Sequence, residues 1–532
     1  MQAVQSKRYF WWFMMIHCTL WVIMPTLMRY ALPHDTIEGA MWGQHLEWGY
    51  DKNPWMNAWL TRLGWEIGGT SGIGIYTLSS FFVGLSFWSV WKLAEKILPP
   101  VSALISVFLL EACINYTLVP QGFNDNVIEL GLWPLMFLCF YNAIYYRDPA
   151  SLRAPRLLAG RSNPDIDAGL LPPRYARCRN DVRAWILTGL VAGLAIMAKY
   201  YTGVPLVMMA LYLLTRKEGR ISFYLSGFYL GVLAFLVVIL PHVIWLFQHD
   251  FLTVRYAFNR ADSFQHHFWI LHFYYPFDFA YTQLLDFLLP ILLILFFRRS
   301  GVETQYFASP FILFMSSGPF LLTIILAMVF GWHLYNEWGV PLVALWGILL
   351  ILIFKPEISE EKFRKFMIII YSIMFLWAIG YAAGLFINSK HKHSDNYPAQ
   401  DIANYVTEQW QEKYHKPLKY IAGSRYIGGY IAFYSHDHPS VYVEWNDQFS
   451  PWINVAEMKK YGAVFIQDNY YGTTVFGKHP YTDNGKAFPA EVLKQYPKLI
   501  ILPVKYFNWK RGNKHDDPIP VLIGFLPPQM IK

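Results

Sequence analysis

Acidic, histidine and tryptophan side chains are concentrated in the segment HDTIEGAMWGQHLEWGYDKNPW, from His34 to Trp55. In this segment Asp35 could orient or deprotonate an acceptor, with Glu38 as a second carboxylate. A structural role as a helix N-cap fits Asp35 equally well, because Asp35 and Glu38 have the spacing of a helix capping box. The other site candidates of this segment are His45, Tyr50 and Lys52. The segment directly follows an apolar run, so we expect it to form one wall of an active site at a membrane surface.

A second acid, Asp125, lies just before the apolar run Val127–Tyr146, and Glu129 follows one helical turn later. An acid at a helix N-terminus also interacts favourably with the helix dipole, so the position of Asp125 leaves a catalytic and a structural interpretation open. Glu129, and likewise Glu111 in an earlier run, would be costly inside a membrane unless it faced a cavity or a partner. We therefore expect at least one of these acids to line a pocket.

A lone lysine, Lys199, interrupts the long apolar run Ala184–Leu214 in the stretch AIMAKYYTGVP. Such a lysine could extend to the membrane surface, or it could meet a phosphate as a point charge. Gly203 and Pro205 are expected to break the helix here. Broken helices inside membrane proteins are tolerated where protein or water covers the backbone, which favours a site at Lys199.

Two arginines, Arg255 and Arg260, follow another apolar run in the stretch PHVIWLFQHDFLTVRYAFNR. They could hold a phosphate bidentately, or each could pair with a lipid headgroup. The remaining site candidates are His249, Asp250, His333 and Glu337. The last two have the i, i+4 spacing of one helix face and are a candidate metal pair. The sequence thus leaves a divalent cation open and indicates no other cofactor.

The composition is that of a membrane protein. Only 15% of the 532 residues are charged and 55% are hydrophobic, whereas a soluble domain carries about 25% charged residues. The 22 Trp and 36 Tyr residues suit many membrane surfaces, where amphipathic rings collect. The net charge of +8 comes in short clusters between apolar runs, which argues against a nucleic-acid-binding protein. The cysteines, Cys18, Cys113, Cys139 and Cys178, have no metal-ligand spacing and indicate no disulfide framework.

Apolar runs of roughly bilayer length divide the first 388 residues. They occupy Phe10–Ala31, Ile75–Lys92, Val101–Val119, Val127–Tyr146, Ala184–Leu214, Ile221–Phe247, Leu284–Phe297, Pro310–Phe330, Val340–Phe354 and Phe366–Ile387. The Ala184–Leu214 run is too long for one helix, so we expect two short spans or a re-entrant hairpin with Lys199 at its tip. The sequence predicts a polytopic helical membrane protein with about 11 to 13 spans.

Lysine and arginine are enriched in the cytoplasmic loops of such proteins, so the basic clusters predict the topology. The clusters lie at Lys7 and Arg8, Lys92 and Lys96, Arg147–Arg183, Arg216–Arg220, Arg298 and Arg299, and Lys355–Lys365. They fit a single side if the N-terminus is cytoplasmic and the C-terminal region is outside. The loops rich in acids, histidine and tryptophan then all fall on the outer face, as an extracytoplasmic active site requires.

The composition changes after residue 388, and residues 389–532 are polar without a run of bilayer length. We expect a membrane domain over residues 1–388 and a separate extracytoplasmic α/β domain over residues 389–532. An amphipathic helix is predicted at Asp401–Tyr414, and further helical segments at Val455–Tyr461 and Ala490–Gln495. Strands are predicted at Tyr420–Ala422, Val441–Glu444, Ala463–Gln467 and Leu499–Val504.

Four segments in order resemble the family 39 glycosyltransferases of the GT-C fold. The stretch DTIEGAMWGQHLEWGYDKNPWMNAWL, from Asp35 to Leu60, is similar to the family pattern DEAYYWLWSQHLxxGYYDHPPLxAWL. NDNVIELGLWPLMFL, GLAIMAKYYTGVPL and PHVIWLFQHDF follow and resemble later family segments. The chain departs from the pattern at Thr36, where the family has a second acid, at Glu38, where an aromatic residue is common, and in DKNPWM. These departures leave the acceptor open and make Glu38 a candidate replacement for the missing acid.

The resemblance implies an enzyme of the bacterial inner membrane that transfers a sugar from a polyprenyl-phosphate donor, with inversion, to an envelope acceptor. It implies that Asp35 and Asp125 are catalytic carboxylates and that Lys199, with Arg255 or Arg260, contacts the donor phosphate. Lipid A or another lipopolysaccharide is the first expected acceptor, and a protein hydroxyl or another envelope glycan is the second. A transporter or flippase of lipid-linked sugar is the alternative from another class, although such proteins usually show paired broken helices in two halves.

Overall fold

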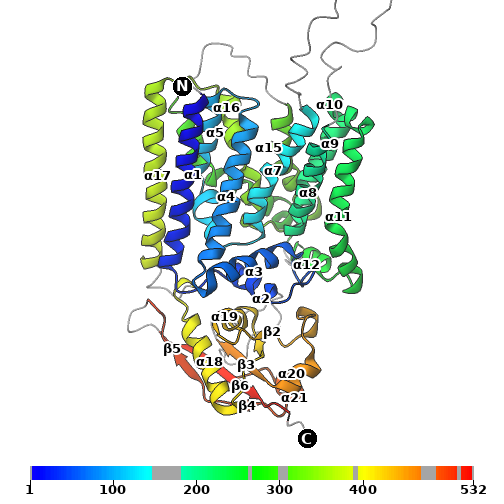
Figure 1. Ribbon diagram of the computed structural model, residues 1–532, viewed down its shortest axis with the longest axis vertical. Helices are drawn as coiled ribbons and strands as arrows, with labels where there is room; N and C mark the ends of the chain where they lie inside the picture. The colour runs from blue at the N-terminus through cyan, green and yellow to red at the C-terminus, as the bar shows by residue number, and fades with distance from the viewer. Residues whose placement is uncertain are drawn as a thin grey trace, which may run out of the picture.

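The computed structural model describes residues 3–145, 181–261, 267–297, 310–387, 394–468, 487–511 and 517–529. Within these ranges the chain forms a bundle of apolar helices with a mixed α/β domain at one end (Figure 1). The predicted fold class, a polytopic helical membrane protein with a C-terminal α/β domain, is confirmed. Three features of the sequence prediction lie outside the described residues: Cys178, most of the Arg147–Arg183 cluster, and the pair Arg298 and Arg299.

Six described helices are long and apolar enough to cross a bilayer. They are α1 (Ala3–Met28), α4 (Ile73–Ala94), α7 (Asp125–Tyr145), α11 (Ser226–Gln248), α15 (Pro310–Phe330) and α17 (Glu360–Ile387). Three further candidates are bent pairs: α5 (Pro100–Glu111) with Ile114–Gln121 at 84°, Ile270–Asp286 with α14 (Leu288–Ile294) at 46°, and η8 (Asn336–Val343) with α16 (Trp346–Phe354) at 58°. The described residues therefore offer six to nine spans.

The Ala184–Leu214 run folds as two shorter apolar helices, α8 (Val182–Ala198) and α9 (Gly203–Thr215). The expected number of about 11 spans is reached only if both count as crossings, because each is shorter than a full bilayer span. Lys199 lies at the break in extended conformation, with φ −160° and ψ 139°. The predicted helix break is therefore present, and Gly203 and Pro205 lie in the first turn of α9, where the missing N–H of proline needs no partner.

Close backbone contact fixes these short helices against their neighbours. Gly189 of α8 packs on the carbonyl of Gly231 in α11, and a Cβ on Gly231 would lie 2.6 Å from the carbonyl oxygen of Trp185. Small residues at facing positions allow membrane helices to approach this closely. The α8–α11 contact therefore holds the end of α8, and with it Lys199, in place.

Three short helices lie across one end of the bundle, between the long helices and the C-terminal domain (Figure 1). They are α2 (His34–Gly43), α3 (Met56–Gly68) and α12 (Leu252–Ala261). The N-terminus and α10 (Lys217–Arg220), which carries the predicted KEGR cluster, lie at the opposite end of the bundle (Figure 1). The loop rich in acids and the described basic clusters near residues 7 and 217 are thus separated by the length of the helices.

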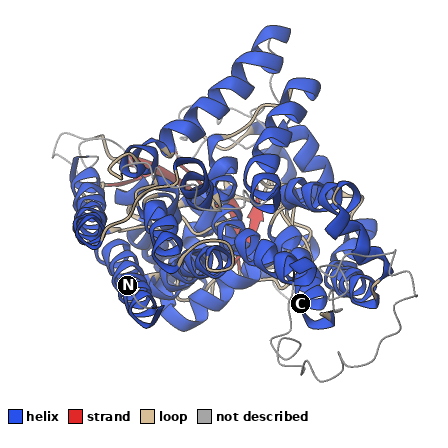
Figure 2. Ribbon diagram, turned by 90° about the horizontal axis from the view of Figure 1, so that it is seen from above, coloured by secondary structure: helices blue, strands red, loops and turns tan. Residues whose placement is uncertain are grey.

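The C-terminal domain contains a six-stranded mixed sheet in the order β2-β1-β3-β6-β4, with β5 pairing with β6. Its strands are β1 (Tyr420–Gly423), β2 (Ser440–Val443), β3 (Ala463–Asp468), β4 (Ile500–Ile501), β5 (Lys505–Phe507) and β6 (Ile519–Leu526). Strands β1, β2 and β3 are parallel, and β6 runs antiparallel to its partners. In the view along the bundle, the membrane helices largely cover the strands (Figure 2).

The helices of this domain are α18 (Ala399–Tyr414), α19 (Arg425–Tyr434), α20 (Val455–Tyr461) and α21 (Ala490–Gln495). Helix α19 packs against α2 and joins the domain to the first loop. The hydroxyl of Tyr434 accepts a hydrogen bond from the amide of Leu32 at 3.1 Å, and Tyr430 donates to the Leu32 carbonyl at 2.9 Å. An ion pair between Arg29 and Asp395 holds a neighbouring part of the contact.

Candidate active site

A polar cavity of about 340 Å³ lies where α2, α7, α12, η8 and α19 meet. Seven predicted site residues line it: Asp35, Glu38, Lys52, Asp125, Lys199, Arg260 and Glu337. They come from segments that are far apart in the chain. The structure therefore brings together both candidate catalytic aspartates and two of the three candidate phosphate-binding cations.

Asp35 lies in the first turn of α2, and its side chain is exposed to the cavity. Pro33, and not Asp35, is the N-cap residue, and its side chain makes no capping hydrogen bond. Oδ2 of Asp35 accepts a hydrogen bond from Nδ2 of Asn124 at 3.0 Å. The capping-box alternative is therefore wrong, and the hydrogen bond from Asn124 orients the Asp35 carboxylate.

Asp125 begins α7 and is paired with Lys199 across the cavity wall. Nζ of Lys199 lies 3.0 Å from Oδ2 of Asp125 and donates to Oδ1 of Asn126 at 2.6 Å. The same ammonium group lies 5.4 Å from the ring centroid of Trp338, within the range of a cation–π interaction. Two adjacent residues of α7 thus fix the position of this cation.

Glu129 is completely buried behind that pair and does not line either described cavity. Its Oε1 accepts a hydrogen bond from Thr202 at 2.8 Å, and the Thr202 hydroxyl accepts one from the indole of Trp133 at 3.0 Å. Glu129 therefore holds the turn that follows Lys199. Glu111 pairs with His17 inside the bundle at 2.7 Å. Of the acids named for the membrane helices, Asp125 is the one that the structure places on the cavity wall.

The first loop contributes Glu38 and Lys52, which form an ion pair of 2.6 Å. Burial raises the pKa of the Glu38 carboxyl, and the charges of Lys52 and Arg425 oppose that shift. Burial also lowers the pKa of Lys52, against the effect of Glu38. Thr36, where the family has a second acid, is buried and donates to the carbonyl of Phe123 at 3.1 Å.

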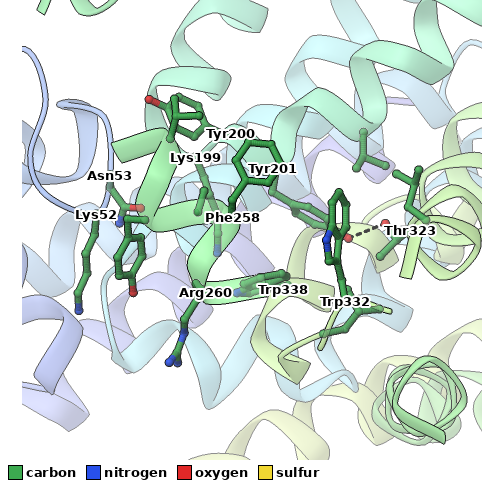
Figure 3. A pocket seen from close by; sticks show the side chains of 16 residues that line it. Lys52, Asn53, Lys199, Tyr200, Tyr201, Phe258, Arg260, Thr323, Trp332 and Trp338 are labelled. Carbon is green, nitrogen blue, oxygen red and sulfur yellow. Dashed lines mark hydrogen bonds between the residues drawn. The ribbon is translucent and has the colours of Figure 1, made fainter. Parts of the chain in front are cut away.

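A second cavity of about 450 Å³, lined mostly by aromatic and aliphatic side chains, adjoins the first. Figure 3 shows Lys52, Lys199 and Arg260 on one side of it, and Trp332 and Thr323 on the other. The same three cations also line the polar cavity. Their guanidinium and ammonium groups therefore mark the boundary between a polar and an apolar space.

Arg260 lies in the last turn of α12, with its guanidinium carbon 4.1 Å from the ring centroid of Tyr335. Arg255 is exposed on the same helix and lines neither of the two described cavities, so the predicted arginine pair is not formed. The reason is helical spacing: five residues turn Arg255 well away from Arg260 around the axis. Arg260 alone joins Lys199.

Five other predicted site residues also lie away from the walls of both described cavities. They are His45, Tyr50, His249, Asp250 and His333. Tyr50 donates to the carbonyl of His45 at 2.5 Å, and the His45 ring stacks on Trp452 at 5.9 Å. Both side chains are thus used inside the first loop and its contact with the C-terminal domain.

His249 stacks on Trp245 of its own helix at 4.1 Å, and Asp250 follows in a left-handed turn with φ 50°. The prediction that His333 and Glu337 share one helix face is wrong, because residues 331–335 are not helical and η8 begins at Asn336. The His333 ring packs edge-on against Tyr275 at 4.4 Å, while Glu337 lines the polar cavity. Among the described residues, no group of three or more His, Cys, Asp or Glu side chains could hold a metal ion.

Sequence reasoning missed several residues of the polar cavity. These are Asn53, Asn57, Asn126, Tyr256, Tyr335, Trp338 and Tyr426. Asn53 and Asn126 directly follow predicted site residues, so extending each motif by one position would have found them. Tyr426, and its buried neighbour Arg425, belong to the C-terminal domain and carry no local signal of a link to a loop nearly 400 residues earlier.

Comparison with known proteins supports the resemblance found in the sequence. The family model of dolichyl-phosphate-mannose-protein mannosyltransferases matches residues 52–160 and 174–245. No curated protein sequence gives a match.

Among solved structures, the chain is similar to ArnT from Cupriavidus metallidurans bound to undecaprenyl phosphate. The TM-score is 0.60 at 12% identity, over 96% of each chain. The apo structure of the same ArnT gives a TM-score of 0.54 at 12% identity, over 98% of each chain. The shared fold therefore includes the C-terminal domain, and the chain's resemblance to the family 39 glycosyltransferases of the GT-C fold is confirmed.

Proposed function

We propose that this chain is an integral-membrane glycosyltransferase that moves a sugar from a polyprenyl-phosphate carrier to an acceptor in the cell envelope. One observation carries the proposal: Lys52, Lys199 and Arg260 stand at the boundary between a polar and an apolar cavity. A lipid-linked sugar needs an apolar space for its chain, cations for its phosphate and a polar space for its sugar. The solved ArnT with undecaprenyl phosphate supports this class of donor.

In the proposed reaction, an acceptor oxygen attacks the anomeric carbon while the bond from that carbon to the phosphate oxygen breaks. The electron pair of this bond leaves with the polyprenyl phosphate, and the anomeric configuration is inverted. Lys199 and Arg260 stabilise the growing negative charge of the phosphate, which is the main catalytic effect in a partly dehydrated site. Lys52 completes this group of cations.

The acceptor proton is taken by a carboxylate at the polar end of the cavity, and we assign this role to Asp35. Asp35 is exposed to the cavity and is oriented by Asn124, whereas Oε1 of Glu38 is occupied by Lys52 and Arg425. Glu38 is therefore a supporting acid in this proposal and does not replace the acid that Thr36 lacks. Asp125 acts by holding Lys199.

Lipid A or another lipopolysaccharide is the proposed acceptor, with the site on the outer face of a bacterial inner membrane. The full-length similarity to the ArnT fold, which includes the C-terminal domain, supports this acceptor. A protein hydroxyl is the second candidate, because the family model that matches residues 52–160 and 174–245 describes protein mannosyltransferases.

Mass spectra of envelope lipids and envelope proteins, from cells with and without the chain, test the proposal. We expect a lipid A species heavier by one sugar residue only when the chain is expressed. The same mass difference on a protein would favour the second acceptor. Unchanged spectra for both fractions, with the chain present in the membrane, would contradict the proposal.

A further inference from the structure

Four buried charges connect the first loop to the C-terminal domain. Arg425, the first residue of α19, has only 2% of its surface exposed. Its Nη1 lies 2.8 Å from Oε1 of Glu38, and its Nη2 lies 2.5 Å from Oδ2 of Asp51. Nζ of Lys52 lies 2.6 Å from the same Oε1 of Glu38. Two acids and two bases therefore balance within one cluster.

Neighbouring groups fix this cluster in space. The indole of Trp42 donates to Oδ1 of Asp51 at 3.1 Å, and the Arg425 guanidinium lies 5.9 Å from the Trp42 ring centroid. The loop that holds Asp51 and Lys52 closes through a bridge between Gly49 and Pro54. A bidentate arginine on two carboxylates of one loop restricts that loop in direction as well as in distance.

Stability alone is a weak explanation for such a cluster. Removing several charges from water costs about as much free energy as their attraction returns, so apolar residues often serve as well or better. The C-terminal domain is also held by other contacts, from Arg29 to Asp395 and from Tyr430 and Tyr434 to Leu32. The cluster is therefore not needed for docking alone, and its place beside the cavity points to the site.

We propose that Arg425 is a positioning residue that directs Lys52 toward the donor phosphate and keeps its charge available. The inference rests on the proposed function, in which Lys52 is one of three cations facing that phosphate. Arg425 and Lys52 share one carboxylate oxygen of Glu38, so Arg425 neutralises part of the negative charge that Lys52 would otherwise pair with. Without Arg425, Glu38 would neutralise Lys52 alone, and Asp51 would lose its charged partner and keep only the hydrogen bond from Trp42.

The test uses the full-length protein in lipid nanodiscs, with undecaprenyl phosphate as the probe and native mass spectrometry as the readout. Arg425→Lys keeps the charge but cannot reach both carboxylates with one planar group. We expect it to bind the probe at least about tenfold more weakly, as a misplaced binding group would. Arg29→Gln, which breaks a docking contact away from the cluster, should bind as the wild type does.

A double-mutant cycle with Lys52→Met separates positioning from a general effect on the fold. If Arg425 acts through Lys52, Arg425→Lys should weaken binding in the wild type and have no further effect in Lys52→Met. Should Arg425→Lys fail to fold, Glu38→Gln serves instead, because it removes the carboxylate that Arg425 and Lys52 share. It should change binding in the wild type and have no further effect in Lys52→Met. Equal effects of Arg425→Lys in both backgrounds, or unchanged binding, would overturn the proposal. Loss of folding in both Arg425→Lys and Glu38→Gln would show a structural cluster and overturn it as well.

The wild-type result distinguishes this inference from the proposed function. If the wild type fails to bind undecaprenyl phosphate, the proposed donor is wrong and the inference fails with it. If the wild type binds the probe and the Arg425 and Glu38 variants bind it equally well, the donor assignment stands and only the role of Arg425 is wrong.

Discussion

The ammonium group of Lys199 lies 3.0 Å from the carboxylate of Asp125, although one residue follows α8 and the other begins α7. The pair places a cation at the boundary of the two cavities and gives it a fixed counter-ion. A cation that is already oriented loses little freedom when a phosphate arrives, so such a pair favours binding of an anionic ligand.

Lys199→Gln should weaken binding of undecaprenyl phosphate by about ten- to a hundredfold, because a charge-assisted hydrogen bond contributes about 1.5–3 kcal/mol. Titration of the purified protein in nanodiscs measures the effect. The matched variant Asp125→Asn keeps the ammonium group and should lower sugar transfer more than it lowers binding. Equal losses of binding in the two variants would mean that the pair acts through the fold and not through the cation.

Asp35→Asn should lower sugar transfer by at least about a hundredfold, the lower end of the effect of a general base. Binding of undecaprenyl phosphate should stay unchanged, because Asp35 is paired with Asn124 and not with the three cations. A transfer assay with membrane extracts and purified protein measures the transfer, and titration of the protein in nanodiscs with undecaprenyl phosphate measures the binding. Glu47→Gln, in the same loop but outside the cavity wall, is the control. Full transfer by Asp35→Asn would refute the assignment of the base.

His45 predicts a pH dependence of stability, since burial lowers its pKa to about 4. An unfolded histidine has a pKa of about 6.5, so the unfolded chain binds more protons as the pH falls. The contribution of neutral His45 is present above pH 6.5 and is lost as the pH falls toward 4. At pH 5 the expected loss is roughly 2 kcal/mol. Thermal unfolding at pH 7 and pH 5 should show a smaller difference for His45→Gln than for the wild type, and an equal difference would contradict the prediction.

Gly189→Leu should destabilise the membrane domain by about 1–3 kcal/mol, because a side chain there meets the backbone of α11 at Gly231. The measurement is the midpoint of thermal unfolding in detergent. Gly380→Leu, in α17, is the control, because a Cβ at Gly380 meets no atom within 4 Å. Similar midpoints for both variants would show that the α8–α11 contact is less close than described.

Cysteine labelling can test the proposed sidedness, in a background without the four native cysteines. His436→Cys, in the C-terminal domain, should react with a membrane-impermeant maleimide in cells whose outer membrane is permeable. Lys217→Cys, in α10 at the other end of the bundle, should react only after the inner membrane is opened. The reverse pattern would place the cavity on the cytoplasmic side and exclude the proposed reaction.

The elements that position the site could mostly be predicted from the sequence, because apolar runs of bilayer length leave few alternatives. The run Pro310–Phe330 agrees with α15 at both ends, and Val455–Tyr461 and Ala490–Gln495 agree with α20 and α21. Strand β6 was not predicted, although it lies between β3 and β4; it contains Pro520 near its start, and proline is unusual in a central strand.

Some of the side chains that line the cavity could also be predicted from the sequence, and others could not. Asp35, Asp125 and Lys199 stand at the ends of apolar runs, where polar groups are costly without a reason, and all three line the cavity. His249 and Arg255 follow such a run too, but the turn at Asp250 and Phe251, with φ 50° and 55°, directs the chain differently. The contact of Arg425 with the first loop could not be predicted, because Asp51 is distant in sequence and no periodicity links the two residues.

The guanidinium that α19 inserts between Glu38 and Asp51 has a consequence for how such a chain can change over time. A substitution at either acid leaves an uncompensated cation in the other half of the protein, so the two halves are constrained to vary together. A chimera whose sheet domain has no arginine at this position would leave Asp51 buried without its cation. It should hold the first loop poorly unless the partner acids are exchanged too, although the other contacts between the halves remain.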